Sequence, residues 1–125
     1  MRTRTIFGLT SLFLLCACAA HNDGTPVKID SAELRAIRTE AKQQIATWDH
    51  LAKQSVRCDS ALQTHVVKVA SAHHIKLRGY VEEIDLALAE RRIVPAQMTD
   101  RRQQIDADRR FADDVEGMIR TECPA

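Results

Sequence analysis

The chain has few aromatic side chains and no marked excess of charge of either sign. Only five of its 125 residues are Phe, Trp or Tyr, which argues against a stacking groove for bases or sugars. Lys and Arg number 18 against 17 Asp and Glu, so the formal net charge is +1 at pH 7. This balance gives no electrostatic reason to expect nucleic acid as a partner, and no polybasic patch indicates attraction to anionic lipid.

The motifs of common enzyme classes are also missing. The sequence has neither a glycine-rich phosphate loop nor a G-x-S-x-G nucleophile motif. Its carboxylates are spread along segments that we expect to be exposed helical faces, and a slender helical domain offers no obvious deep pocket. We therefore predict that the protein is not an enzyme and uses no cofactor.

The amino terminus has a basic start followed by a short apolar segment. Arg2 and Arg4 precede an apolar run from Ile6 to about Leu15. This run is about ten residues long, whereas a membrane-spanning helix needs about 20. The basic start, the short apolar middle and the small residues that follow are typical of a bacterial secretory signal, which we assign to residues 1–17.

The end of this signal contains two closely spaced cysteines. Leu15-Cys16-Ala17-Cys18 resembles the lipobox of bacterial lipoproteins, in which an aliphatic residue and two small residues precede the lipidated cysteine. The resemblance implies that Cys18 becomes the mature amino terminus and carries acyl chains that anchor it stably to a membrane. By analogy with lipoprotein sorting in Gram-negative bacteria, Ala19 implies the outer membrane. Alternatively, Ala17-Cys18-Ala19 is an A-x-A cleavage site, and the product is a soluble periplasmic protein.

The mature chain divides into a tether and one domain. We interpret residues 18–29, which include Gly24 and Pro26, as the lipidated cysteine and a flexible tether, and residues 30–125 as a helical domain. Without Arg2 and Arg4, 16 basic residues face 17 acidic residues, a formal charge of −1.

Helix-forming residues dominate the domain, and the alternation typical of strands is absent. A first helix is expected from Asp30, which opens a D-x-x-E capping box, to about Arg57. A second is expected over about 61–93, opened by Ser60 in an S-x-x-Q box. A third begins at Pro95, a residue tolerated in the first turn of a helix.

Each predicted helix has an apolar stripe with spacings of three and four residues, or of seven in the third helix. In the second helix the stripe stays in phase across Gly79, which favours one continuous helix. A helix that ends at Gly79, after the basic turn Lys76-Leu77-Arg78, is the alternative. The main stripe residues are Leu34, Ile37, Ala41, Ile45, Trp48, Leu51 and Ala52; Leu62, Val66, Val69, Ala70, His73, Leu77, Tyr80, Val81, Ile84 and Leu88; and Met98, Ile105, Ala112 and Ile119.

Three helices joined by short connections are expected to pack as an elongated up-down-up antiparallel bundle. Cys58 at the end of the first helix and Cys123 at the end of the third would then be neighbours. Because the periplasm is oxidising, we predict a Cys58–Cys123 disulfide. Closing a loop of about 65 residues would stabilise the fold by about 4 kcal/mol on the chain-entropy model.

The histidines of the second helix are the candidates for an alternative, metal-binding function. His65 and His73 are separated by about 80° around the helix and about 12 Å along it, and His73 and His74 point about 100° apart. The i,i+4 spacing that lets two imidazoles bind one zinc ion is therefore missing. We expect His73 to be a buried or half-buried polar residue that needs a hydrogen-bond partner. A periplasmic metal-binding or stress-sensing protein remains the second hypothesis.

A second, weaker apolar stripe on the second helix contains Val67, Ile75, Leu86 and Ile93. Ile75 and Leu86 are 11 residues apart and so share nearly the same azimuth. These residues either complete a wide core or form a surface for a partner or for a second copy of the chain.

The polar third helix supplies the other part of the hypothetical partner surface. Arg102 with Asp106, Arg109 with Asp113, and Arg110 with Asp114 have the i,i+4 spacing of a solvated, ion-paired face, or alternatively of a site for an acidic partner. We assign partner binding to Ile75, Leu86, Arg102 and Arg109.

The leading hypothesis is a lipid-anchored, non-enzymatic helical protein that binds another envelope protein. It would serve as an accessory subunit of a secretion or envelope complex, or as an inhibitor or immunity factor. This class is chosen by analogy with small lipoproteins.

Overall fold

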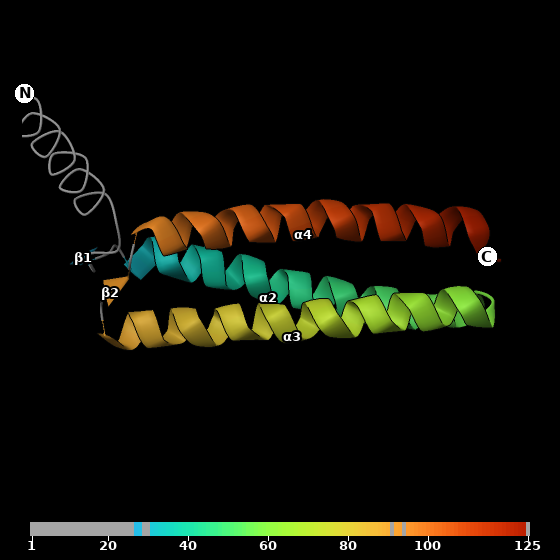
Figure 1. Cartoon of the computed structure of the whole chain (residues 1–125), viewed down its shortest axis with the longest axis horizontal. Coiled ribbons are helices and arrows are strands. Elements are labelled where there is room, and N and C mark those ends of the chain that lie inside the picture. The colour runs from blue at the N-terminus through green and yellow to red at the C-terminus, as the bar shows by residue number, and fades with distance from the viewer. Residues whose placement is uncertain (1–26, 29–30, 91, 94, 125) are drawn as a thin grey trace, which may run out of the picture.

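The computed structural model of the chain describes residues 27–28, 31–90, 92–93 and 95–124. Three long helices contain most of them: α2 (Ser31–Gln54), α3 (Ser60–Glu90) and α4 (Pro95–Glu122). The helices lie side by side along one long axis (Figure 1). The predicted all-α helical bundle is therefore confirmed for the described residues. The predicted signal peptide and Cys18 lie outside them.

Different links close the two ends of the bundle. A single 3₁₀ turn, η1 (Ser55–Arg57), follows α2 and leads to Cys58, which is bonded to Cys123 after α4. The Cα atoms of this disulfide are 4.6 Å apart, and the predicted pairing is confirmed. At the opposite end, β1 (Val27–Lys28) pairs antiparallel with β2 (Arg92–Ile93), as Figure 1 shows. Val27–Lys28 were expected to lie in the tether. A strand of two residues is too short to show the alternating pattern from which strands are predicted.

The start of α3 differs from the predicted S-x-x-Q capping box. The carboxylate of Asp59 accepts a hydrogen bond from the Leu62 amide at 2.8 Å, and its carbonyl accepts one from the Gln63 amide at 2.9 Å. Asp59 is therefore the N-cap, and the assignment of Ser60 to this role is wrong. The helix continues through Gly79 and ends at Glu90 rather than near residue 93, because Arg92 and Ile93 pair with β1.

The core lies along the line where the three helices meet. Every residue of the predicted main stripes is either buried or packed against this core. None of the described helices contains a stretch long and apolar enough to cross a membrane. The buried apolar residues are Leu34, Ile37, Ala41, Trp48 and Leu51 from α2, Val66, Ala70, Leu77, Ile84 and Ala87 from α3, and Ile105, Ala112, Val115 and Ile119 from α4.

Candidate functional site

A buried carboxylate ties the three helices together. The side chain of Asp108, on α4, is 0% exposed. It accepts hydrogen bonds from the indole N–H of Trp48 at 2.7 Å and from the amide of Gln44 at 3.0 Å, both on α2. It also pairs with Nδ1 of His73 on α3. Buried charges are tolerated only when they are paired and hydrogen-bonded, and Asp108 meets both conditions.

Aromatic stacking surrounds this carboxylate. The His73 ring stacks on Trp48 with 4.7 Å between centroids, and Phe111 lies tilted against both rings. Lys76 lies at the edge of the cluster, with its ammonium 4.0 Å from the Asp108 carboxylate. His73 thus has the hydrogen-bond partner that its half-buried position requires. Because these contacts connect three helices within the core, we interpret the cluster as structural.

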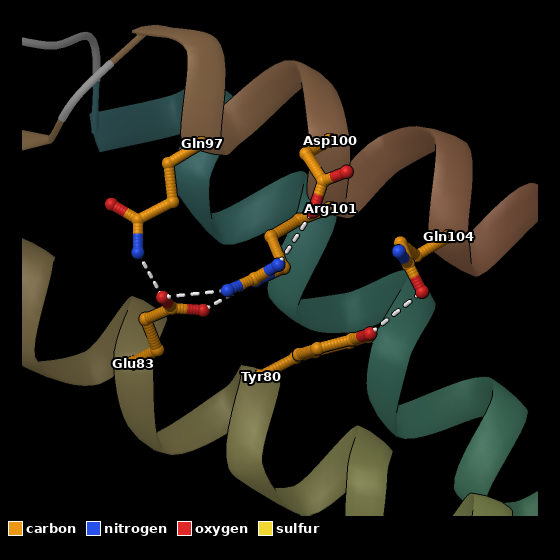
Figure 2. Close-up of polar contacts among 6 residues, drawn as sticks. All are labelled: Tyr80, Glu83, Gln97, Asp100, Arg101 and Gln104. Carbon is orange, nitrogen blue, oxygen red and sulfur yellow. Dashed lines mark hydrogen bonds and ion pairs between the residues drawn. The ribbon is translucent and has the colours of Figure 1, made fainter. Parts of the chain in front are cut away.

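A second polar network lies between α3 and α4. Figure 2 shows Glu83 of α3 in contact with Arg101 and Gln97 of α4. Arg101 donates from Nε to Glu83 at 2.5 Å and from a second nitrogen at 3.0 Å, an arrangement that adds geometric specificity to the charge attraction. Its guanidinium also lies 4.7 Å from the centroid of the Tyr80 ring, and the Tyr80 hydroxyl donates to Gln104 at 3.0 Å.

These contacts shift the ionisation of the groups involved. The hydrogen bond from Arg101 lowers the pKa of Glu83, although partial burial opposes the change. The same hydrogen bond raises the pKa of Arg101. Burial is the main cause of the raised pKa of Tyr80. These directions favour an ionised Glu83, a protonated Arg101 and a neutral Tyr80, the states in which the contacts between α3 and α4 are strongest.

A groove runs between α2 and α3 and contains two adjoining hollows. The first, of about 360 Å³, is mainly apolar, and the second, of about 480 Å³, is rich in charge. His74 lines both hollows and its Nδ1 is 2.9 Å from the Asp49 carboxylate. The first is lined by Asp49, Ala52, Val67, Ala70, Ser71, His74 and Ile75, and the second by Arg38, Lys42, Ile45, His74, Arg78, Val81, Glu82 and Asp85.

Some polar side chains of this α2–α3 groove are paired and others are not. Ser71 lines the same hollow as His74 and Asp49, whose imidazole and carboxylate are paired with each other. In the second hollow Arg38 is paired with Asp85 at 2.6 Å, whereas Lys42 and Arg78 form no ion pair with any described residue. The groove thus offers an apolar hollow beside one that holds two cations, Lys42 and Arg78, and one carboxylate, Glu82, without an ion pair to any described residue.

The outer face of α3 points away from both other helices. We use this name for five exposed residues: Lys68, Ala72, Gly79, Leu86 and Glu90. Leu86 on this face is 58% exposed, and Val67 and Ile75, which line the first hollow of the groove, are 44% and 69% exposed. The second apolar stripe therefore does not complete the core through these three residues.

The four residues assigned to partner binding do not form one patch. Ile75 and Leu86 lie on α3, whereas Arg102 of α4 donates to Glu33 of α2 at 2.9 Å. Arg109 contacts Asp106 at 3.4 Å within α4.

The predicted ion pairs Arg102–Asp106, Arg109–Asp113 and Arg110–Asp114 do not occur among the described residues. Arg102 takes a different partner because packing brings Glu33, a residue distant in sequence, within reach. Spacing along α4 alone could not show this contact.

The three histidines considered as metal ligands have separate surroundings. His65 is exposed, His73 pairs with Asp108, and His74 pairs with Asp49. In the part of the chain that the structure describes, no three His, Cys, Asp or Glu side chains are grouped to hold a metal ion.

Comparisons with protein families, with curated proteins and with solved structures find no match.

Sequence reasoning did not identify Gln44 and Asp108 as core residues. Each nevertheless stands in phase with the apolar stripe of its helix: Gln44 between Ala41 and Trp48, and Asp108 between Ile105 and Ala112. A polar residue at a stripe position is the signal that could have found them, because such a residue is buried and must be satisfied by another element.

Proposed function

We propose that this protein is a lipid-anchored, non-enzymatic envelope protein whose helical domain binds another envelope protein. The anchor and location follow from the lipobox-like segment ending at Cys18. The Cys58–Cys123 disulfide supports an oxidising compartment, since such bonds persist mainly outside the cytoplasm. An up-down-up course of the helices is supported by the disulfide at one end and the β1–β2 pairing at the other.

The observation that carries the proposed binding role is the α2–α3 groove. Val67, Ile75 and the methyl group of Ala52 line one hollow, and Lys42 and Arg78 line the next. The groove between two neighbouring helices can bind a third helix, whose apolar side chains pack between them.

The occupant that fits the groove is an amphipathic helix of an envelope protein, with apolar residues followed by acidic ones. Its apolar part would cover the first hollow, and its carboxylates would face Lys42 and Arg78. Charge complementarity of this kind sets the register of the partner and excludes basic competitors.

The binding role is tested by partner capture from membranes with two matched variants. Val67→Asp places a charge in the apolar hollow and should abolish capture. Leu86→Asp makes the same kind of change at an exposed apolar residue outside the groove and should leave capture unchanged. Lys42→Glu should weaken capture and make it less sensitive to salt. Partner profiles for Val67→Asp and Lys42→Glu identical to the wild type would overturn the assignment of the groove.

The anchor is tested separately with Cys18→Ser. The variant should leave the membrane fraction, because it lacks the thiol that would carry the acyl chains. A variant that still sediments with membranes as the wild type does would contradict lipidation at Cys18.

A further inference from the structure

The outer face of α3 is a straight line of residues with Gly79 at its centre. Lys68 and Glu90 are each eleven residues from Gly79, and Ala72 and Leu86 are each seven residues from it. At 3.6 residues per turn, steps of seven and eleven return to within about 20° of the starting direction. All five positions therefore share one azimuth, and all are exposed.

The chemistry along this line is complementary about its centre. A positive charge at one end, Lys68, is matched by a negative charge at the other, Glu90. A small side chain, Ala72, is matched by a large exposed apolar one, Leu86. Neither Lys68 nor Glu90 forms an ion pair with another residue in the described ranges.

Gly79 has no role in the packing of the domain itself. A Cβ added there would meet nothing within 4 Å. Glycine destabilises the interior of a helix relative to alanine, so a glycine inside α3 that the packing of the domain does not require calls for a reason. The usual reason for such a glycine is that the backbone of another helix approaches closely there, as in helix pairs that cross at small residues.

From these observations we infer that the outer face of α3 binds a second copy of this chain in an antiparallel, two-fold arrangement whose axis passes Gly79. In this arrangement Leu86 of each copy lies against Ala72 of the other, and Lys68 of each copy pairs with Glu90 of the other. A two-fold interface requires a surface that is complementary to itself, and this face meets that requirement in both charge and shape. The inference does not depend on the proposed partner, which occupies the α2–α3 groove.

A contact made by one helix from each copy buries an area at the low end of the range for specific interfaces. The association is therefore expected to be weak in dilute solution and to strengthen when anchoring confines the chains to one surface. The measurement is sedimentation equilibrium of the full mature chain in detergent over a wide concentration range.

Charge reversal tests the arrangement most sharply. Lys68→Glu and Glu90→Lys should each weaken self-association at least about tenfold, since each puts like charges opposite one another twice. A mixture of the two variants should associate as well as the wild type, because every pair then regains opposite charges. The double variant carrying both changes should also self-associate. Arg110→Glu, an exposed reversal on α4, is the matched control and should leave association unchanged.

Two further variants test the apolar part and the centre. Leu86→Asp should weaken self-association about 100-fold, because the contact occurs twice. Gly79→Leu should prevent it, while Gly117→Leu on α4 should not. Circular dichroism of each variant shows whether the helices are retained. A wild-type chain that stays monomeric at every concentration, or charge variants that fail to restore association when mixed, would overturn the inference. Either result would leave partner capture by the groove unaffected.

Discussion

The buried Asp108 provides the clearest prediction about stability. Asp108→Ala removes the acceptor for the indole of Trp48 and the amide of Gln44, and the partner of His73. Each buried donor left without a partner costs about 1–3 kcal/mol, and the change leaves two such donors, on Trp48 and Gln44. Because His73 is partly exposed and water can reach it, we expect the loss to be about 4 kcal/mol. This is a large share of the roughly 5–15 kcal/mol that stabilises a typical domain.

The assay is urea unfolding of the disulfide-bonded protein, followed by tryptophan fluorescence. Trp48 is the only tryptophan in the chain and stacks on His73, so its emission reports directly on the cluster. The control is Asp106→Ala, two residues away on an exposed part of α4, which should change stability by less than about 0.5 kcal/mol. If Asp108→Ala lost less than about 1 kcal/mol with an unchanged denaturant slope, the cluster would not hold the helices together as argued.

Three other predictions concern the stability of the helical bundle. Replacing Cys58 and Cys123 by serine should lower the free energy of unfolding by about 4 kcal/mol, because the disulfide closes a loop of 65 residues; an unchanged midpoint in urea would contradict this. Gly79→Ala should raise that free energy by about 0.5–1 kcal/mol, measured by thermal unfolding of the monomer, since the new methyl group meets no atom. The pKa of Glu83 is lowered in the folded state. Its contribution to the free energy of unfolding is therefore complete above its ordinary pKa near 4.5 and is lost as the pH falls through its pKa in the folded protein. The stability advantage of the wild type over Glu83→Gln should therefore shrink on acidification in urea titrations at several pH values, and an advantage that stayed constant would contradict this.

Much of the fold could be predicted from local pattern. Apolar spacing located all three helices, and the position of Cys58 and Cys123 at helix ends predicted their bond. Helix formation depends on neighbours in sequence, and one oxidised pair of cysteines in a compact domain leaves little choice.

The candidate sites were harder to predict because they depend on how the helices are rotated against each other. Arg102 pairs with Glu33, 69 residues away, rather than with Asp106 in the next turn. The contacts of Asp108 with Trp48 and of Glu83 with Arg101 likewise join different helices. Burial patterns say which face of a helix is inside, but not which of two neighbouring helices a given side chain meets.

The proposed function is tested most directly by placing a photo-activated cross-linking residue at position 67, within the α2–α3 groove, in living cells. The account predicts a covalent adduct with one envelope protein, at an amphipathic helix bearing acidic residues, and no such adduct from the same residue at position 103, which is exposed on α4. No adduct from position 67, or the same adducts from both positions, would contradict it.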